Sequence, residues 1–408
     1  MNKFLIINPF GIGDVLFTTP VISAIKDRLP DSFIGYWCNE RVGDLLRDNL
    51  KIDRVFALSR GDIKRIYKYS PLKRLTALFK LINEIRKEGF DIAFDFSLDG
   101  RYGLWSKLAG IKKRIGLDYK NRGRFLTDKI DLKGYSGRHV VEYYFDLLKF
   151  IGIKTSSPGL DAVNKGRISR GCAPYSLEVS EENRIKARSI LKEYGVVVTD
   201  LLIGVARGGG ASWGKAALYK QWPAEKFAEL ASKLVKDLSA KIILLGSADE
   251  KPIAEIVKKR GQTQAAHDRR DGSDPIFPIV DLTGKLNLKE LAAVISELKL
   301  LICNDGGPLH MAVALGVKTL SMFGPVDEKI YGPYPSNEKH VVIKKDLPCR
   351  PCYKDFRFTG CSNHRRCLED ITIEEVYGQV KELLGEKGAS PNQREIDAMG
   401  QAPFFLTS

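Results

Sequence analysis

Short apolar runs alternate with longer segments of helical period along the first 150 residues of the chain. The runs have the length of buried strands, and the stretches between them repeat apolar residues at the three-to-four-residue spacing of an amphipathic helix. Strands that alternate with helices indicate βαβ units on a parallel sheet. The predicted strands are Phe4–Asn8, Phe33–Cys38, Val55–Leu58 and Ile92–Phe96, and the predicted helices include Val15–Arg28 and Leu75–Lys87.

The same alternation returns after an irregular stretch rich in glycine and proline, residues 152–180. Ser180 and Gly195 suit the N-cap and the end of the next helix. Further helices are predicted at Glu225–Val235 and Lys289–Leu298, and further strands at Leu201–Ala206, Lys241–Leu245, Ile279–Leu282, Leu300–Cys303 and Thr319–Phe323. The pattern therefore predicts an α/β chain of two doubly wound, Rossmann-like domains. Their expected bounds are 1–165 and 196–384, with a linker and connecting helix at 166–195 and a mobile tail at 385–408.

Charge is distributed unevenly between the two halves of the 408-residue chain. Residues 1–170 hold 32 Lys and Arg against 19 Asp and Glu, and the remainder holds 33 against 31. A basic first half fits a phosphorylated acceptor, an anionic membrane surface or nucleic acid. The densest basic stretches are 60–74, which includes Arg60 and Lys64, and 107–124; each could also be a solvated face. No apolar run approaches the roughly 20 residues that span a bilayer, so we expect a cytoplasmic protein.

The junction after the strand Leu300–Cys303 is the most informative segment of the sequence. Asn304-Asp305-Gly306-Gly307-Pro308-Leu309-His310 combines a sharp turn with a proline suited to the first turn of a helix. A helix start gathers free N–H donors and the positive end of a dipole, which can hold a phosphate. The segment therefore predicts an anion site flanked by Asp305 and His310. The alternative is an ordinary strand–helix turn with Asp305 as a cap.

Two glycine-bearing turns follow other predicted strands. Pro9-Phe10-Gly11-Ile12-Gly13-Asp14 places Asp14 at the carboxyl edge of the first sheet, as either a helix N-cap or a catalytic base for an acceptor hydroxyl. In the second half, the turn after Leu201–Ala206 includes Gly209 and Gly210 and is followed by Lys215 and Lys220. Backbone without side chains can approach a ligand closely, and the lysines can neutralise phosphate charge. The alternative is a flexible hairpin with two surface lysines.

These motifs together resemble glycosyltransferase family 9, the ADP-heptose:lipopolysaccharide heptosyltransferases. The resemblance includes P-x-G-I-G-D at 9–14, G-G-G-A-S-W-G-K at 208–215, D-L-T-G-K at 281–285 and N-D-G-G-P-L-H at 304–310. The matches run in the family's order over most of residues 1–380. The resemblance implies a GT-B architecture, with two Rossmann-like domains facing across a cleft, and no required metal or cofactor. It implies an inverting transfer in which an acceptor hydroxyl displaces ADP, to build the lipopolysaccharide inner core.

The resemblance also assigns roles to individual residues. Asp14 corresponds to the family's base, Lys220 to its phosphate-binding lysine and Glu250 to a nucleotide contact. The donor-binding set becomes Gly209, Gly210, Lys215, Lys220, Glu250, Asp305, Gly306, Gly307 and His310. Gly306 stands where many members carry Thr or Ser. Candidate acceptor-binding residues are Gly13, Arg60, Lys64, Arg101 and His139. The expected partners are an ADP-sugar, an anionic lipid-linked saccharide and, through it, the inner membrane surface.

Other functions explain less of the sequence. The same fold could act on another nucleotide-activated sugar for a surface polysaccharide. A GT-B sugar-nucleotide epimerase needs no anionic acceptor and leaves the basic half unexplained. A nucleic-acid-binding module explains neither the glycine-rich second half nor Asp305 and His310, so we expect no nucleic-acid partner.

Four cysteines gather near the end of the second predicted domain. Cys349, Cys352, Cys361 and Cys367 have a spacing that can hold zinc, although the resemblance implies no metal in the chemistry. We therefore expect no catalytic metal and keep a structural site as the lesser alternative. Seven cysteines in a cytoplasmic chain do not indicate a disulfide framework.

Overall fold

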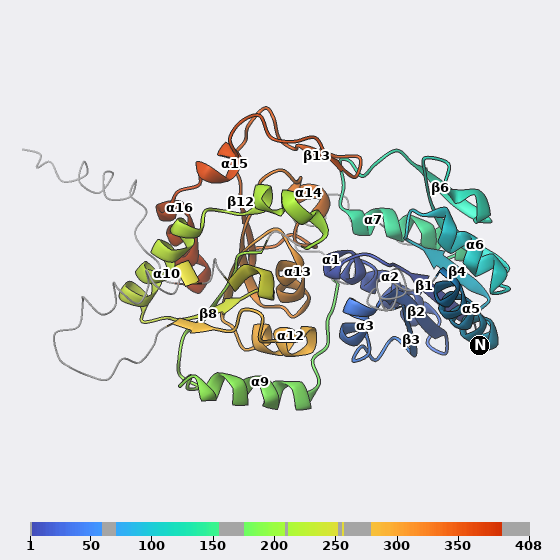
Figure 1. Cartoon of the computed structure of the whole chain (residues 1–408), viewed down its shortest axis with the longest axis horizontal. Helices are drawn as coiled ribbons and strands as arrows, with labels where there is room; N and C mark the ends of the chain where they lie inside the picture. Colours follow the sequence, from blue (N-terminus) through green and yellow to red (C-terminus); the bar gives the residue numbers. More distant parts are fainter. Residues whose placement is uncertain are drawn as a thin grey trace, which may run out of the picture.

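Two lobes, each built on a parallel sheet, make up the protein in a computed structural model (Figure 1). The structure describes residues 2–58, 71–154, 175–208, 211–251, 255–256 and 279–385. The predicted site residues Arg60, Lys64, Gly209 and Gly210 lie outside this range. So do residues 155–174 of the irregular stretch 152–180, which include the first part of the predicted linker, and residues 386–408 of the predicted tail. Within the described residues, no helix has both the length and the apolar character needed to cross a membrane.

The first lobe is a six-stranded parallel sheet with strand order β3-β2-β1-β4-β5-β6. This is the doubly wound order, and its switch point lies between β1 and β4. The strands are β1 (Lys3–Ile7), β2 (Phe33–Asn39), β3 (Arg54–Leu58), β4 (Ile92–Asp95), β5 (Lys113–Tyr119) and β6 (Asp128–Leu132). The helices are α1 (Ile12–Leu16), α2 (Thr19–Arg28), α3 (Glu40–Leu46), α5 (Pro71–Glu88), α6 (Gly100–Leu108) and α7 (Val140–Phe145).

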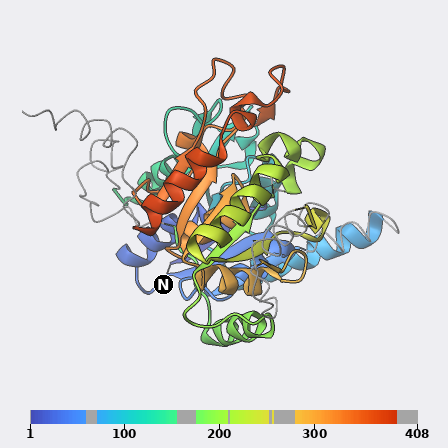
Figure 2. The ribbon, with the colours of Figure 1, turned by 90° about the vertical axis from the view of Figure 1, so that its left-hand side faces the viewer.

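The second lobe repeats this topology. Its parallel sheet has the order β12-β11-β10-β7-β8-β9, so the switch point lies between β7 and β10. The strands are β7 (Leu202–Ala206), β8 (Lys241–Leu245), β9 (Ile279–Asp281), β10 (Leu300–Asn304), β11 (Lys318–Met322) and β12 (His340–Ile343). The helices are α9 (Glu181–Glu193), α10 (Ala224–Leu238), α12 (Leu288–Ser296), α13 (Gly307–Ala314), α14 (Glu328–Tyr331), α15 (Arg366–Glu369) and α16 (Ile373–Leu384). Helices α10 and α16 lie side by side over one face of this sheet (Figure 2).

The helices predicted at Leu75–Lys87, between Ser180 and Gly195, at Glu225–Val235 and at Lys289–Leu298 agree with α5, α9, α10 and α12, and there is one exception near the first sheet. The predicted helix Val15–Arg28 is two helices, because the chain turns at Phe17 and Thr18 before Pro20 enters the first turn of α2. The break leaves α1 only five residues long. The first residues of α1 contact α13 of the second lobe. The predicted caps of α9 are confirmed: the Ser180 hydroxyl accepts a hydrogen bond from Asn183 N–H, and Gly195 has a φ of +70°.

The sequence prediction omits β5, which begins inside the basic stretch 107–124. The Lys113 ammonium donates a hydrogen bond to the carbonyl of Phe150 at 2.6 Å, and the Arg114 guanidinium donates one to the carbonyl of Phe125 at 2.6 Å. These two cations are therefore bound within the fold and do not form part of a free anion-binding face. A small antiparallel pair, β13 (Tyr353–Lys354) and β14 (Arg357–Phe358), is also absent from the prediction.

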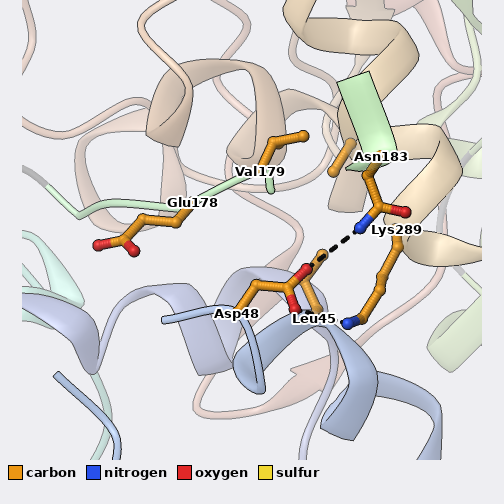
Figure 3. Close-up of a pocket in the computed structure, with 7 residues that line it drawn as sticks. Leu45, Asp48, Glu178, Val179, Asn183 and Lys289 are labelled. Carbon is orange, nitrogen blue, oxygen red and sulfur yellow. Dashed lines mark hydrogen bonds and ion pairs between the residues drawn. The ribbon is translucent and has the colours of Figure 1, made fainter. Parts of the chain in front are cut away.

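The two lobes contact each other away from the sheet ends as well. Asp48, just after α3 of the first lobe, pairs with Lys289 of α12 at 2.6 Å and accepts a hydrogen bond from Asn183 of α9 at 3.4 Å. Figure 3 shows these side chains converging on a small pocket between the lobes. At the opposite end of the interface, the Tyr119 hydroxyl donates to the Asp355 carbonyl at 3.0 Å. These contacts hold the carboxyl ends of the two sheets toward each other.

Candidate active site

Helices α1 and α13, which follow the central strands of the two sheets, meet start to start (Figure 1). Their approach is close enough to require glycine at position 13 and to leave little room for a side chain at position 307. A Cβ on Gly13 would lie 2.6 Å from Cδ2 of His310, and one on Gly307 would lie 3.0 Å from Cδ1 of Ile12. The contact joins the two topological switch points, where ligands bind in doubly wound folds. The structure thus brings together the predicted residues Gly13, Gly307 and His310.

Asp14 enters this junction from the first lobe. Its Oδ2 accepts a hydrogen bond from Gly11 N–H at 3.2 Å, and Asn8 donates its side-chain amide to the Asp14 carbonyl at 2.9 Å. Burial raises the pKa of the Asp14 carboxyl to about 6, while the nearby Lys220 lowers it and Asp305 raises it. Asp14 is the third residue of α1, and Gly11 is its N-cap, so the prediction of Asp14 as an N-cap is wrong. The position gives a carboxylate of nearly neutral pKa next to the charges of the second lobe.

Lys220 and Asp305 form a buried ion pair on the second lobe. The Lys220 Nζ lies 2.6 Å from Asp305 Oδ2, and the two side chains are 8% and 7% exposed. The ammonium also lies 4.8 Å from the ring centroid of Trp213. Lys220 ends the 3-10 segment Ala211–Lys220 after β7, and Asp305 follows β10, so neighbouring strand ends supply the pair. An anion bound here would interact with the Lys220 ammonium while that ammonium stays paired with the Asp305 carboxylate.

The predicted strand–turn–helix junction at residues 300–310 is confirmed. Strand β10 ends at Asn304, Gly306 is the N-cap of α13, and a proline occupies the first turn. No side chain caps this helix, and the Asp305 carboxylate pairs with Lys220 instead. The alternative of Asp305 as a helix cap is therefore wrong. The uncapped N–H groups of α13 and the ammonium of Lys220 both lie at the carboxyl edge of the second sheet, next to the end of β10.

His310 lies in the first turns of α13 as a buried, neutral imidazole. Its Nε2 lies 4.0 Å from Asp305 Oδ1, and the Tyr175 hydroxyl lies 3.3 Å from its Nδ1. Burial lowers the pKa of His310 to about 4, and Lys220 adds to that effect. The ring of Phe17 packs edge-on against the imidazole, with centroids 4.8 Å apart. His310 thus offers a fixed hydrogen-bonding group without a charge at pH 7.

Glu250 and Arg207 lie at the ends of β8 and β7. The Glu250 carboxylate accepts from Ser247 N–H at 3.0 Å and packs against Gly208 and Gly246, where a Cβ would lie within 2.3 Å of it. Burial raises the pKa of Glu250 and lowers that of Arg207 to about 10. In the described part of the chain, Nη1 of Arg207 is buried without a hydrogen-bond partner. Sequence reasoning missed Arg207, although it directly precedes the glycine run that it predicted as a ligand site.

Three other predicted residues lie in different surroundings. Lys215 is exposed. Arg101 is 71% exposed and pairs with Asp99, the N-cap of α6. His139 is buried and caps α7: its Nδ1 accepts from Val141 N–H at 3.2 Å, and its Nε2 bonds to the carbonyl of Gly332 in the second lobe at 3.1 Å. With both ring nitrogens engaged, His139 acts here as a contact between lobes; its role in acceptor binding stays a prediction.

The four clustered cysteines are free thiols. Cys349 is exposed, Cys352 and Cys361 are half-buried, and Cys367 is buried. Arg365 N–H donates to the Cys361 sulfur at 3.3 Å, and the Cys352 thiol donates to the Cys349 carbonyl at 3.1 Å. Across the described residues, no three His, Cys, Asp or Glu side chains are grouped so as to hold a metal ion. A metal at these cysteines thus gains no support from their arrangement.

Comparison with known proteins shows the family to which this chain belongs. Residues 78–361 match the model of glycosyltransferase family 9 (heptosyltransferase). Lipooligosaccharide heptosyltransferase 2 of Campylobacter jejuni is 28% identical over 385 residues, 93% of this chain and 99% of that protein. Lipooligosaccharide heptosyltransferase 2 of Haemophilus influenzae is 28% identical over 388 residues, 94% of this chain and 100% of that protein.

Solved structures show the same fold. A glycosyltransferase of family 9 from Veillonella parvula superposes with a TM-score of 0.74 at 23% identity, covering 95% of this chain and 98% of its own. The ADP-heptose lipopolysaccharide heptosyltransferase II of Escherichia coli gives a TM-score of 0.70 at 22% identity, covering 95% and 100%. The paired six-stranded sheets and these neighbours confirm the predicted GT-B architecture. Because the family model spans more than half of its length, this chain belongs to glycosyltransferase family 9, the heptosyltransferases.

Proposed function

We propose that the protein transfers heptose from ADP-heptose to the inner core of lipopolysaccharide, with inversion at the anomeric carbon and without a metal. One observation carries the proposal. The half-buried carboxyl of Asp14, whose pKa is raised to about 6, lies on one lobe next to the Lys220–Asp305 pair and the start of α13 on the other. A base and an anion site at the same junction suit the displacement of a nucleoside diphosphate by a hydroxyl group.

Asp14 acts as the general base in this proposal. It takes the proton of the acceptor hydroxyl as that oxygen attacks the anomeric carbon from the face opposite the diphosphate, and the carbon–oxygen bond to ADP breaks in the same step. A base works best when its pKa lies near the working pH, and the pKa of about 6 leaves Asp14 mostly ionised at pH 7. The Gly11 N–H hydrogen bond orients the carboxylate for this task.

The second lobe stabilises the departing ADP. Negative charge grows on the leaving diphosphate as the bond breaks, and preorganised donors aimed at that charge lower the barrier. Lys220 supplies a full positive charge, the uncapped start of α13 supplies N–H groups, and His310 supplies a neutral hydrogen bond. In the proposed reaction these groups take the place of a metal: one cation, whose charge Asp305 shares, and several N–H donors face the diphosphate.

The acceptor approaches from the basic first lobe. An inner-core saccharide carries phosphate and acidic sugars, and a positive surface attracts such a molecule and the membrane that holds it. Described cations of this lobe that the fold leaves at the surface include Lys107, Lys112, Arg122 and Arg124. We propose that these, together with Arg101, contact the acceptor or the membrane surface.

A transfer assay with purified lipopolysaccharide that lacks the inner-core heptoses tests the proposal. ADP-heptose should give ADP and a heptosylated product at the same rate with and without EDTA. The matched donors are UDP- and GDP-activated hexoses, which should give no product. Transfer from one of these and none from ADP-heptose would overturn the donor assignment, and loss of activity in EDTA would overturn metal independence.

A further inference from the structure

Tyr175 reaches the candidate site from the connection between the two lobes, immediately before α9. Its side chain is buried, and the adjacent Ser176 N–H donates to Thr19 Oγ1 of the first lobe at 3.0 Å. The phenol ring packs edge-on against Phe17, with centroids 5.5 Å apart, and its hydroxyl lies 3.3 Å from Nδ1 of His310. The connection therefore places a hydroxyl against one specific nitrogen of a site residue.

The Tyr175 hydroxyl is able to be the donor in this hydrogen bond. Burial raises the pKa of the phenol above its ordinary value, so the oxygen keeps its proton. That proton can be donated to Nδ1 of His310, which lies 3.3 Å away. A neutral imidazole that accepts at Nδ1 carries its single proton on Nε2.

The contact at Nε2, on the other side of the His310 ring, favours the same Nε2–H tautomer. Nε2 of His310 faces Oδ1 of Asp305 at 4.0 Å, and a carboxylate oxygen only accepts hydrogen bonds. A bare Nε2 there would set two acceptors against each other in a buried site, which is costly. Both neighbours of the imidazole thus favour the proton on Nε2.

We propose that Tyr175 is a positioning residue, which holds His310 as the neutral Nε2–H tautomer and so aims an N–H donor at the Lys220–Asp305 anion site. The identity of the anion as the donor diphosphate rests on the proposed function. The tautomer does not, because it is set by protein groups alone. The role resembles that of the outer partners that fix the ring orientation of histidines in other sites.

His139 provides a reference within the same protein. Its Nδ1 accepts from a backbone N–H and its Nε2 bonds to a backbone carbonyl, so backbone groups fix its Nε2–H tautomer without Tyr175. The chain has only five histidines. Ring-nitrogen signals of a histidine-labelled protein can therefore be assigned by removing one histidine at a time.

The test is ¹⁵N NMR of the ligand-free protein with labelled histidines, with His310→Gln used for assignment. In the wild type, Nε2 of His310 should give the signal of a protonated nitrogen and Nδ1 that of an unprotonated one. In Tyr175→Phe the two signals should move toward each other as the second tautomer becomes populated, while those of His139 stay in place. Tyr119→Phe is the matched control, because it removes a hydroxyl contact between the lobes that does not involve His310.

Kinetics give a second readout. Tyr175→Phe should lower kcat/KM about tenfold, the value of one hydrogen bond, and Tyr175→Phe in a His310→Gln background should have no further effect. Unchanged His310 signals in Tyr175→Phe, or a protonated Nδ1 in the wild type, would overturn the proposal. So would an equal kinetic loss in both backgrounds. If no heptose transfer is found at all, the proposed function fails while the NMR result still decides the role of Tyr175.

Discussion

The carboxyl group of Asp14 is half-buried where the two lobes meet, and the loss of solvent there makes its ionisation costly. The folded-state pKa is about 6, against 3.8 for the free side chain. Between these values the folded protein binds more protons at Asp14 than the unfolded chain does. The residue therefore favours folding at low pH, and that contribution is lost as the pH rises through 6. The proposed base must be ionised for chemistry, and its ionised form opposes stability at neutral pH.

Replacing Asp14, the proposed base, should stabilise the protein. At pH 8, Asp14→Asn should raise the free energy of unfolding by up to about 3 kcal/mol, since two pKa units correspond to roughly that amount. At pH 5 the gain should be smaller, because the wild-type carboxyl is then mostly protonated. Urea unfolding at both pH values measures the difference. A variant less stable than the wild type at pH 8 would show that the burial of Asp14 carries no such cost.

Gly13 is required by the contact between the two helix starts. Gly13→Ala places a methyl group against the packed ring of His310, so we expect donor affinity and turnover to fall at least tenfold while the lobes still fold. Gly11→Ala is the control, because its Cβ would make only an ordinary 3.7 Å contact with Asp14. Steady-state kinetics of both variants measure donor KM and kcat. Equal values for Gly13→Ala and Gly11→Ala would mean that the His310 ring can move aside for the added methyl group.

Among single residues, the sequence could predict those that stand in motifs and not those that depend on tertiary contacts. Asp14, Lys220, Asp305 and His310 follow strand ends in recognisable turns, and the structure brings them together. Tyr175 lies in an irregular connection where neither periodicity nor a motif singles it out. Its role is visible only after folding has placed it against a residue 135 positions later in the chain.

At the scale of elements, the ion pair between Lys220 and Asp305 links the turns after β7 and β10. Lys220→Met should weaken ADP binding about tenfold or more and lower the free energy of unfolding by about 3 kcal/mol, because it leaves Asp305 buried without a counter-charge. Calorimetric titration with ADP and urea unfolding measure the two effects.

Two further variants sharpen this prediction. The double variant Lys220→Met/Asp305→Asn should recover most of the stability and none of the ADP affinity, since it removes the unpaired charge without restoring a cation. Lys233→Met removes a partly exposed lysine of α10 that pairs with Asp237, and should change neither quantity appreciably. Unchanged ADP affinity in Lys220→Met would contradict the assignment of Lys220 to the phosphate.

Elements were predictable wherever an apolar pattern was strong. The bounds of β8, Lys241–Leu245, were predicted without error because five consecutive residues are buried in the centre of a parallel sheet. Strand β5 was missed because Lys113 and Arg114 at its start suggest a surface. Their charges are bound by carbonyls of distant segments, which no local pattern reveals.

At the scale of the whole molecule, neither lobe holds all the groups of the proposed site. The proposed base belongs to the first sheet, and the cation and the helix start belong to the second. His139, Tyr119 and Asp48 make contacts that hold the lobes together. Composition could predict which lobe is basic, and repeated βα patterns could predict two domains. How the lobes approach each other is set by side-chain contacts between residues far apart in the sequence, and was not predictable from periodicity.

In the proposed reaction, Asp14 takes the proton of the acceptor when the site transfers heptose from ADP-heptose. A single-turnover assay of wild-type protein and Asp14→Asn, with ADP-heptose and heptose-deficient lipopolysaccharide, tests it most directly. We predict that both proteins bind the donor with similar affinity, that transfer by the variant is at least about a hundredfold slower, and that kcat/KM of the wild type falls as the pH drops below about 6. Transfer by Asp14→Asn at a rate near that of the wild type would contradict the account.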